Sequence, residues 1–154
     1  MIFAPFSLYE LIKNEPAPYK QDYMDDGWVA SSYLVPDSNL ALKNYRLKFS
    51  RHKVAEEQIN SLTTKLCEIS SRGVQVVCFR PPTTHQMRNL EDSLSGYDEI
   101  TIKKNLQCSF VVWLDFKDSD FESYDGSHLD EKSARKLSRE IGDQINAGFL
   151  PLLN

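Results

Sequence analysis

The chain has 154 residues, of which 41% are hydrophobic and 26% are charged, and its formal net charge is −4 at pH 7. This composition suits one globular domain with its own core. The negative charge and the scattered basic residues argue against a nucleic-acid binder. No apolar run is long enough to span a bilayer, and the N-terminus lacks the features of a secretory signal. From these absences we expect a cytoplasmic protein.

The chain contains three cysteines, Cys67, Cys78 and Cys108. Their odd number and the lack of a Cys-x-x-Cys pair argue against a disulfide framework and against a zinc site. Cys67 and Cys78 lie in apolar patterns, so we expect them to be small core residues. This cysteine usage fits a reducing compartment.

Residues 1–52 predict an irregular N-terminal part of a single domain that spans 1–154. Residues 1–12 fit a short strand followed by a helical turn, and the next stretch, rich in Pro and Asp, has the poor periodicity of a long connection. Within that stretch, residues 27–35 are compatible with a strand. Residues 40–53 are ambiguous between helix and loop.

Residues 53–148 predict a clear α/β core. The runs 74–79 and 109–116 are short, apolar and rich in β-branched residues, which is typical of buried parallel strands. A weaker helical pattern at 84–104 separates them, and a last helix is expected from an N-cap at Asp130. An earlier helix ends near Gly73. Its apolar stripe consists of Ala55, Ile59, Leu62, Leu66 and Ile69, and that of the last helix consists of Ala134, Leu137, Ile141 and Ile145.

The alternation of helices and strands predicts βαβ units with right-handed crossovers. We therefore expect an α/β fold with three layers, α/β/α, and a mostly parallel, flavodoxin-like sheet. In such sheets, ligands bind beyond the carboxyl ends of the strands. Residues that follow the two strands should share that edge, and we predict Arg80 and His85 as substrate-side residues there.

An Asp-x-x-His motif, Asp125 and His128, follows the second strand and precedes the last helix. This spacing on a glycine-containing turn lets the carboxylate accept a hydrogen bond from imidazole Nδ1. The imidazole Nε2 is then free to take a proton from a hydroxyl group. The motif therefore indicates an acid–base pair for nucleophilic catalysis, and it raises the question of where the nucleophile lies.

The surroundings of this motif, DGSHLDEKSARKLSREI, resemble the SGNH hydrolases, also called GDSL-type esterases and lipases, whose final block is Asp-x-x-His before the C-terminal helix. The segment GVQVVCFRPP (73–82) is similar to that family's penultimate core strand. The resemblance covers about residues 53–146 and is strongest to the branch related to membrane-anchored acyl transfer and sugar O-acylation, which is often extracytoplasmic. It implies a serine esterase or O-acyltransferase acting on a small ester or acylated carbohydrate. In that enzyme Asp125 is the orienting acid and His128 the general base.

The family's nucleophile is a serine in Gly-Asp-Ser or Gly-Ser-Ser after the first strand, and neither tripeptide occurs here. The nearest matches are Ser38 in Pro-Asp-Ser-Asn, and Ser31 and Ser32 after Ala30. The residue before Asp37 is Pro36, which fixes φ, whereas the sharp turn that carries the family's serine prefers glycine at this position. We therefore expect the later half of an SGNH-like domain, incomplete on its N-terminal side, with the nucleophile not located.

Two other functions compete with this interpretation. The first is a non-catalytic α/β module, a remnant or a subunit that a partner chain or second copy completes through an exposed sheet edge. The second is a metal-dependent hydrolase that uses the acidic loop after the second strand together with the histidines. That loop lacks the EF-hand spacing, and no His-x-x-x-His pair is present, so we expect neither a metal nor a cofactor. In such a hydrolase the metal ligands would come from Asp115, Asp118, Asp120, His85 and His128.

Overall fold

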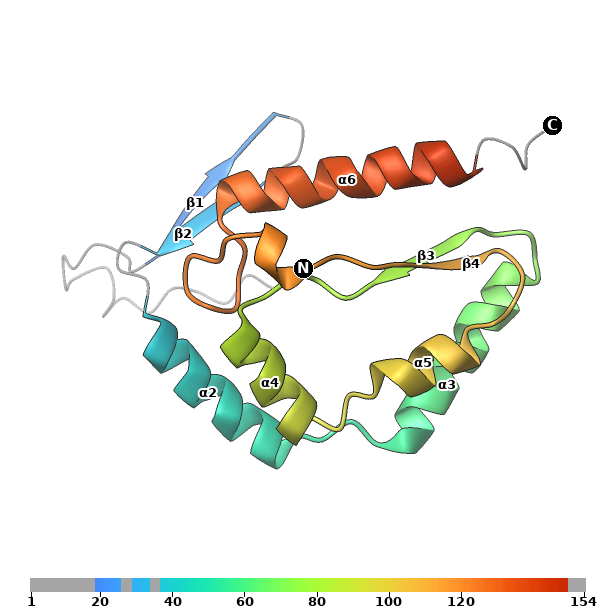
Figure 1. The fold of residues 1–154 in the computed structure, drawn as a ribbon, viewed down its shortest axis with the longest axis horizontal. Helices are drawn as coiled ribbons and strands as arrows, with labels where there is room; N and C mark the ends of the chain where they lie inside the picture. Colours follow the sequence, from blue (N-terminus) through green and yellow to red (C-terminus); the bar gives the residue numbers. More distant parts are fainter. Residues whose placement is uncertain (1–18, 26–28, 34–36, 150–154) are drawn as a thin grey trace, which may run out of the picture. The chain divides into compact units, whose positions relative to one another are not determined.

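The computed structural model describes residues 19–25, 29–33 and 37–149 (Figure 1). The chain divides into two compact units, residues 1–36 and 37–154. This division does not coincide with the boundary at residue 52 that the sequence suggested, and each unit is described by itself below.

The first unit contains an antiparallel hairpin of β1 (Tyr19–Tyr23) and β2 (Val29–Tyr33). The strand expected within residues 27–35 is thus confirmed over β2. The two serines considered as nucleophiles, Ser31 and Ser32, lie inside this strand, opposite Gln21 and Lys20. The strand and helical turn predicted for residues 1–12 fall outside the described residues.

The second unit alternates helices and strands, and the structure is of the mixed α/β class. Residues 40–53, which the sequence left ambiguous between helix and loop, lie largely in a helix that runs from Ser38 to Arg51. The elements are α2 (Ser38–Arg51), α3 (Glu56–Ser70), β3 (Val76–Phe79), α4 (His85–Leu94), α5 (Glu99–Asn105), β4 (Val111–Leu114), the 3-10 turn η1 (Asp118–Asp120) and α6 (Glu131–Phe149).

The strands β3 and β4 pair in parallel, with Val76 opposite Val111 and Phe79 opposite Leu114. The two strands and their parallel pairing were predicted from the two apolar runs and are confirmed. All four residues of β3 are only half-buried, however, whereas a central strand was expected. In the part of the chain that the structure describes, this sheet has two strands, so each strand has only one neighbour.

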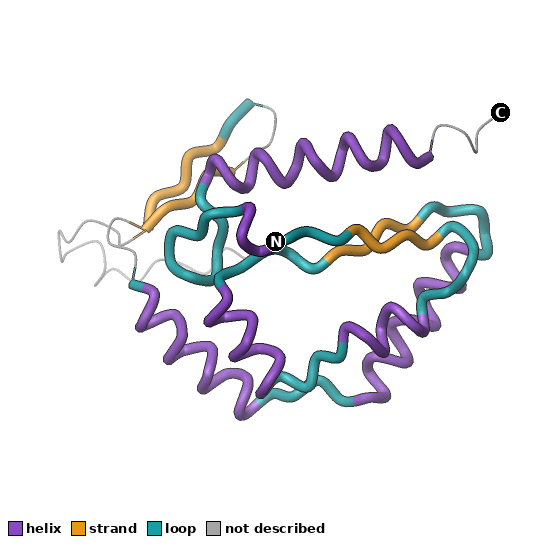
Figure 2. The backbone as a smooth tube through the Cα atoms, in the orientation of Figure 1, coloured by secondary structure: helices purple, strands orange, loops and turns teal. Residues whose placement is uncertain are grey.

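A small core lies where α3 and α5 pack against this sheet (Figure 2). Ile59 from α3 and Ile102 from α5 are buried there, with Leu106 beside them and Trp113 from β4 against them. Of the predicted stripe of α3, Ile59 is buried and Leu66 packs against the core, whereas Leu62 and Ile69 are exposed. The helix ends close to Gly73, as the sequence predicted, and Gly73 has φ +82°, in the left-handed region.

A disulfide joins Cys67 in α3 to Cys108 in the loop before β4, with their Cα atoms 5.8 Å apart. The prediction that Cys67 is an unpaired core residue is wrong. The partner lies 41 residues away in the sequence, and only the packing of α3 along the sheet brings the two together. Cys78 in β3 is a free, half-buried thiol, and burial raises its pKa.

The stretch 84–104, predicted as one weak helical pattern, forms the two helices α4 and α5. Each begins at a side-chain cap, Thr84 for α4 and Asp98 for α5. Gly96 lies between them with φ +75°, and a β-carbon there would come within 2.6 Å of the Val54 carbonyl oxygen. The turn therefore requires glycine, and it divides the helical pattern.

Helices α2 and α4 lie side by side, and both begin next to the loop that follows η1 (Figure 2). The last helix, α6, begins after the predicted cap, since the Ser133 N–H donates to Asp130 Oδ1 at 2.7 Å. Leu137 is buried on its predicted apolar face. No helix of the described ranges is both long and apolar enough to cross a membrane.

Candidate functional site

Asp125 and His128 lie in a tight turn between η1 and α6. The turn is closed by Ser123, whose hydroxyl donates to the His128 carbonyl oxygen at 2.6 Å and accepts from the Gly126 N–H at 2.8 Å. The Tyr124 N–H also donates to the His128 carbonyl oxygen, at 3.1 Å. Gly126 has φ +89°, a conformation that a residue with a β-carbon rarely adopts.

The two side chains meet as the three-residue spacing predicted. Nδ1 of His128 lies 2.8 Å from Asp125 Oδ2. The other carboxylate oxygen, Oδ1, accepts the N–H groups of Ser127 and His128, both at 2.8 Å, and the Ser127 hydroxyl at 3.1 Å. The carboxylate is thus bonded at both oxygens within its own turn.

The Asp125 side chain is only 9% exposed, whereas that of His128 is 55% exposed. Burial alone would raise the pKa of Asp125, but the hydrogen bonds from the His128 ring and from the two backbone N–H groups hold it below its ordinary value of 3.8. Because an ionised carboxylate can only accept, Nδ1 of a neutral His128 carries the proton. Nε2 is then left with a free lone pair, which is the arrangement that a general base requires.

The Ser127 hydroxyl also lies close to the imidazole, 2.9 Å from Nδ1. With the proton on Nδ1, this hydroxyl donates to Asp125 instead of to the ring. A nucleophile has to approach the opposite nitrogen, Nε2, so Ser127 supports the pair but is not placed to be activated by it. The Tyr124 ring stacks on His128 with 5.8 Å between centroids and covers one face of the imidazole.

The start of α2 lies against this turn, and it carries Ser38, the nucleophile candidate from the sequence. A β-carbon built on Gly126 would lie 3.5 Å from Ser38 Cβ and 3.6 Å from Ser38 Oγ. Asp37 caps the helix by accepting the Leu40 N–H at 2.9 Å, which leaves Ser38 in the first turn. Within the described chain no hydrogen bond joins Ser38 to His128, but the structure brings this serine close to Gly126, one of the two residues between the members of the pair.

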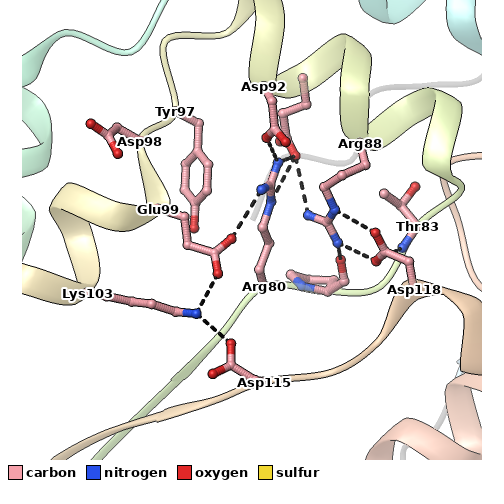
Figure 3. A network of polar contacts seen from close by, with 12 residues as sticks. Arg80, Thr83, Arg88, Asp92, Tyr97, Asp98, Glu99, Lys103, Asp115 and Asp118 are labelled. Atoms are coloured by element: carbon pink, nitrogen blue, oxygen red, sulfur yellow. Dashed lines mark hydrogen bonds and ion pairs between the residues drawn. The ribbon is translucent and has the colours of Figure 1, made fainter.

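A second group of charged residues gathers at the carboxyl ends of β3 and β4 (Figure 3). Arg80, directly after β3, has a 12% exposed side chain and forms ion pairs with Glu91, Asp92 and Glu99. Its guanidinium also lies 4.6 Å from the centre of the Tyr97 ring. Burial alone would lower the pKa of Arg80, but the hydrogen bonds to these carboxylates raise it. Its predicted substrate-side role stays a prediction, since contacts within the chain already occupy the guanidinium.

The same group continues along both sides of Arg80 (Figure 3). Lys103 bridges Glu99 and Asp115, the first residue after β4. On the other side, Arg88 donates to both oxygens of Asp118, from Nε at 2.9 Å and from Nη2 at 2.6 Å. A cavity of about 170 Å³ lies among these residues. The sequence predicted that the residues after both strands share one edge, and this is confirmed.

His85 and the acidic loop complete the predicted site residues. His85 is exposed at the start of α4, with its ring Nε2 3.1 Å from the amide nitrogen of Asn89, and no contact joins it to His128 in the described structure. In the ranges that the structure describes, no three His, Cys, Asp or Glu side chains form a group that could hold a metal ion. Asp115 and Asp118, considered as ligands, instead pair with Lys103 and Arg88.

Sequence reasoning missed the two threonines that hold the turn. Thr83 and Thr84, which follow Pro-Pro at the end of β3, both donate to the carbonyl oxygen of Gly126. The sequence offers only a general signal for them, namely hydroxyl side chains at a strand end just before a helix.

Comparison of the chain with known protein families, with curated proteins and with solved structures found no match.

Proposed function

We propose that this chain is a serine esterase or O-acyltransferase of the SGNH type. The observation that carries the proposal is the hydrogen bond of 2.8 Å between buried Asp125 and exposed His128, next to the first turn of α2. In this proposal Asp125 orients the imidazole, His128 is the general base and Ser38 is the nucleophile. The substrate is a small ester or an acylated carbohydrate.

The proposed reaction has two halves. The Ser38 hydroxyl adds to the ester carbonyl carbon while its proton passes to Nε2 of His128. The C–O bond to the leaving group then breaks, and the imidazolium returns the proton to the leaving oxygen. Water, in an esterase, or the hydroxyl of an acceptor, in a transferase, attacks the acyl-serine by the same route. The free enzyme is regenerated with all protons accounted for.

The proposal requires Ser38 to come within hydrogen-bond reach of Nε2 when substrate binds. Catalytic hydrogen bonds are often long without substrate and shorten in the complex. Ser38 lies beside Gly126, so the proposal requires a movement of the turn or a rotation of the Ser38 side chain. The exposure of His128 supports access for the ester.

A second candidate function is the non-catalytic module completed by a partner chain or second copy. The half-buried residues of β3 favour it, because an apolar strand that is central to a larger sheet has neighbours on both edges. The three-layer α/β/α architecture belongs to both candidates and needs additional strands beside the described pair.

Hydrolysis of p-nitrophenyl acetate tests the first proposal. We expect Ser38→Ala and His128→Ala to lower kcat/KM by about 10³-fold or more, because each removes a member of one catalytic unit. Ser50→Ala is the matched control, since Ser50 lies at the far end of the same helix and its hydroxyl donates to the Leu47 carbonyl oxygen. A folded Ser38→Ala variant that keeps the wild-type rate would contradict the assignment.

A further inference from the structure

The carbonyl oxygen of Gly126, a buried residue, accepts three hydrogen bonds from the loop that precedes α4. The Thr84 hydroxyl donates to it at 2.8 Å, the Thr83 hydroxyl at 3.0 Å and the Thr84 N–H at 3.5 Å. Gly126 lies between Asp125 and His128, so this carbonyl fixes the peptide at the centre of the acid–base turn. Thr83 and Thr84 are 42 or more residues away in the sequence, so the contact joins two separate loops.

The loop that carries the two threonines is itself held by the ion pair between Arg88 and Asp118. The Thr83 N–H donates to Asp118 Oδ1 at 3.0 Å, and Arg88 binds both oxygens of the same carboxylate. Arg88 Nη2 also donates to the Pro81 carbonyl oxygen at 2.9 Å. The loop from β3 to α4 is therefore bonded at several points, which gives its two hydroxyl groups a defined position (Figure 3).

The threonines connect the acid–base turn to the helix pair that carries the serine. Thr84 caps α4, and α4 packs along α2, which begins at Ser38. A hydrogen bond from α4 to Gly126 therefore sets the position of the Asp125–His128 turn relative to the α2 start. The Asp125–His128 hydrogen bond lies within the turn itself, so the threonines act on it only by ordering the turn.

We propose that Thr83 and Thr84 are positioning residues that hold the Asp125–His128 turn against the start of α2 through the Gly126 carbonyl. This inference rests on the proposed function for its effect on catalysis. Its structural part, the ordering of the turn, can be measured without any catalysis.

The test compares Thr83→Val/Thr84→Val with Thr83→Ser/Thr84→Ser. Serine keeps both hydroxyl donors, whereas valine keeps the shape and removes them. We expect the rate of labelling by a fluorophosphonate to fall about 10- to 100-fold in the valine variant, because a displacement of about 1 Å is sufficient for such a loss. The serine variant should label at close to the wild-type rate.

Two controls separate positioning from loss of stability. Thr84→Val also removes the cap of α4, so Asp98→Ala, which removes the corresponding cap of α5, should leave labelling unchanged. The single variant Thr83→Val, which touches no cap, should show part of the loss. Circular dichroism confirms that each variant is folded.

Amide hydrogen exchange of Ser127 and His128 provides the readout that is independent of catalysis. Both N–H groups are bonded to Asp125 in the intact turn. We expect the exchange of these amides to be faster in the valine variant and to return to the wild-type rate in the serine variant. This result does not require the chain to react with a fluorophosphonate. A wild-type chain that fails to react would contradict the proposed function but not the positioning role of the threonines. Unchanged exchange in a folded valine variant, or labelling at the wild-type rate, would overturn the inference.

Discussion

Two regions of the second unit bring acidic and basic side chains together, and they do so in opposite ways. Around Arg80, three carboxylates and an aromatic ring occupy one guanidinium, and the side chain is 12% exposed. In the Asp125–His128 turn, the carboxylate is buried and fully bonded but the imidazole is 55% exposed. The guanidinium of the first region pairs with carboxylates of the chain itself, whereas the second region leaves its imidazole exposed. We infer that the Arg80 group stabilises the fold and that the turn performs chemistry.

The largest expected effect concerns the tautomer of His128. Asp125→Asn should lower the rate of ester hydrolysis by about 10³- to 10⁴-fold, because the amide no longer requires the proton on Nδ1. The ¹⁵N chemical shifts of the two ring nitrogens report the tautomer directly, and we expect Nδ1–H to predominate only in the wild-type chain. His52→Ala, which removes an exposed histidine at the end of α2, is the control. Equal tautomer populations in wild type and Asp125→Asn would contradict the account of the turn.

The next largest effect concerns the disulfide, which belongs to the stabilising part of the molecule. Cys67→Ser/Cys108→Ser should lower the free energy of unfolding by about 3–4 kcal/mol, as expected for a cross-link across 41 residues. Denaturant unfolding with and without reductant measures it, and reduction of the wild type should give the same loss. Disulfides persist in oxidising environments. The Cys67–Cys108 disulfide therefore removes the argument that unpaired cysteines gave for a reducing compartment.

Arg80→Leu sharpens the comparison more directly. Three carboxylates lose their shared partner, so we expect a loss of about 2 kcal/mol in the free energy of unfolding, reduced from the value for a fully buried pair because the carboxylates are partly exposed. At a temperature where the variant is folded, kcat should be unchanged. A rise in KM without loss of stability would instead support the substrate-side role that the sequence suggested for Arg80.

The smallest expected effect is the dependence of stability on pH. Asp118 and Asp125 have pKa values held below their ordinary value of 3.8, Asp118 by Arg88 and the Thr83 N–H against the opposing effect of burial. A lowered folded-state pKa contributes stability that is fully present above 3.8 and is lost as the pH falls through the folded-state pKa. Asp118→Asn should therefore be less stable at neutral pH and lose less on acidification below 3.8. Thermal unfolding from pH 7 to pH 2 tests this, and parallel curves for the two proteins would contradict it.

Local patterns predicted the elements that depend on neighbouring residues. The β-branched runs gave β3 and β4, Asp130 gave the start of α6, and three-residue spacing gave the Asp125–His128 hydrogen bond. In each case the physical cause lies within a few residues of sequence, so a single chain carries the signal.

Contacts between distant segments could not be predicted in this way. Helix α2 was ambiguous because Leu40 and Leu47 are exposed and its apolar pattern is weak, so nothing in the sequence placed Ser38 at the turn. The threonines that bind Gly126 and the cysteine that pairs with Cys67 are likewise set by how the helices pack. The mixed α/β class and the Asp125–His128 pair were therefore accessible from the sequence, whereas the contacts that bring Ser38 and the two threonines to the turn were not.

The most direct test of the central claim is to label the purified chain with a fluorophosphonate and to map the modified residue by peptide mass spectrometry. The account predicts one label, on Ser38, that is lost in His128→Ala while Ser50→Ala labels normally. A label on another serine, or no label on a chain that circular dichroism shows to be folded, would contradict the assignment of Ser38, His128 and Asp125 as one catalytic unit.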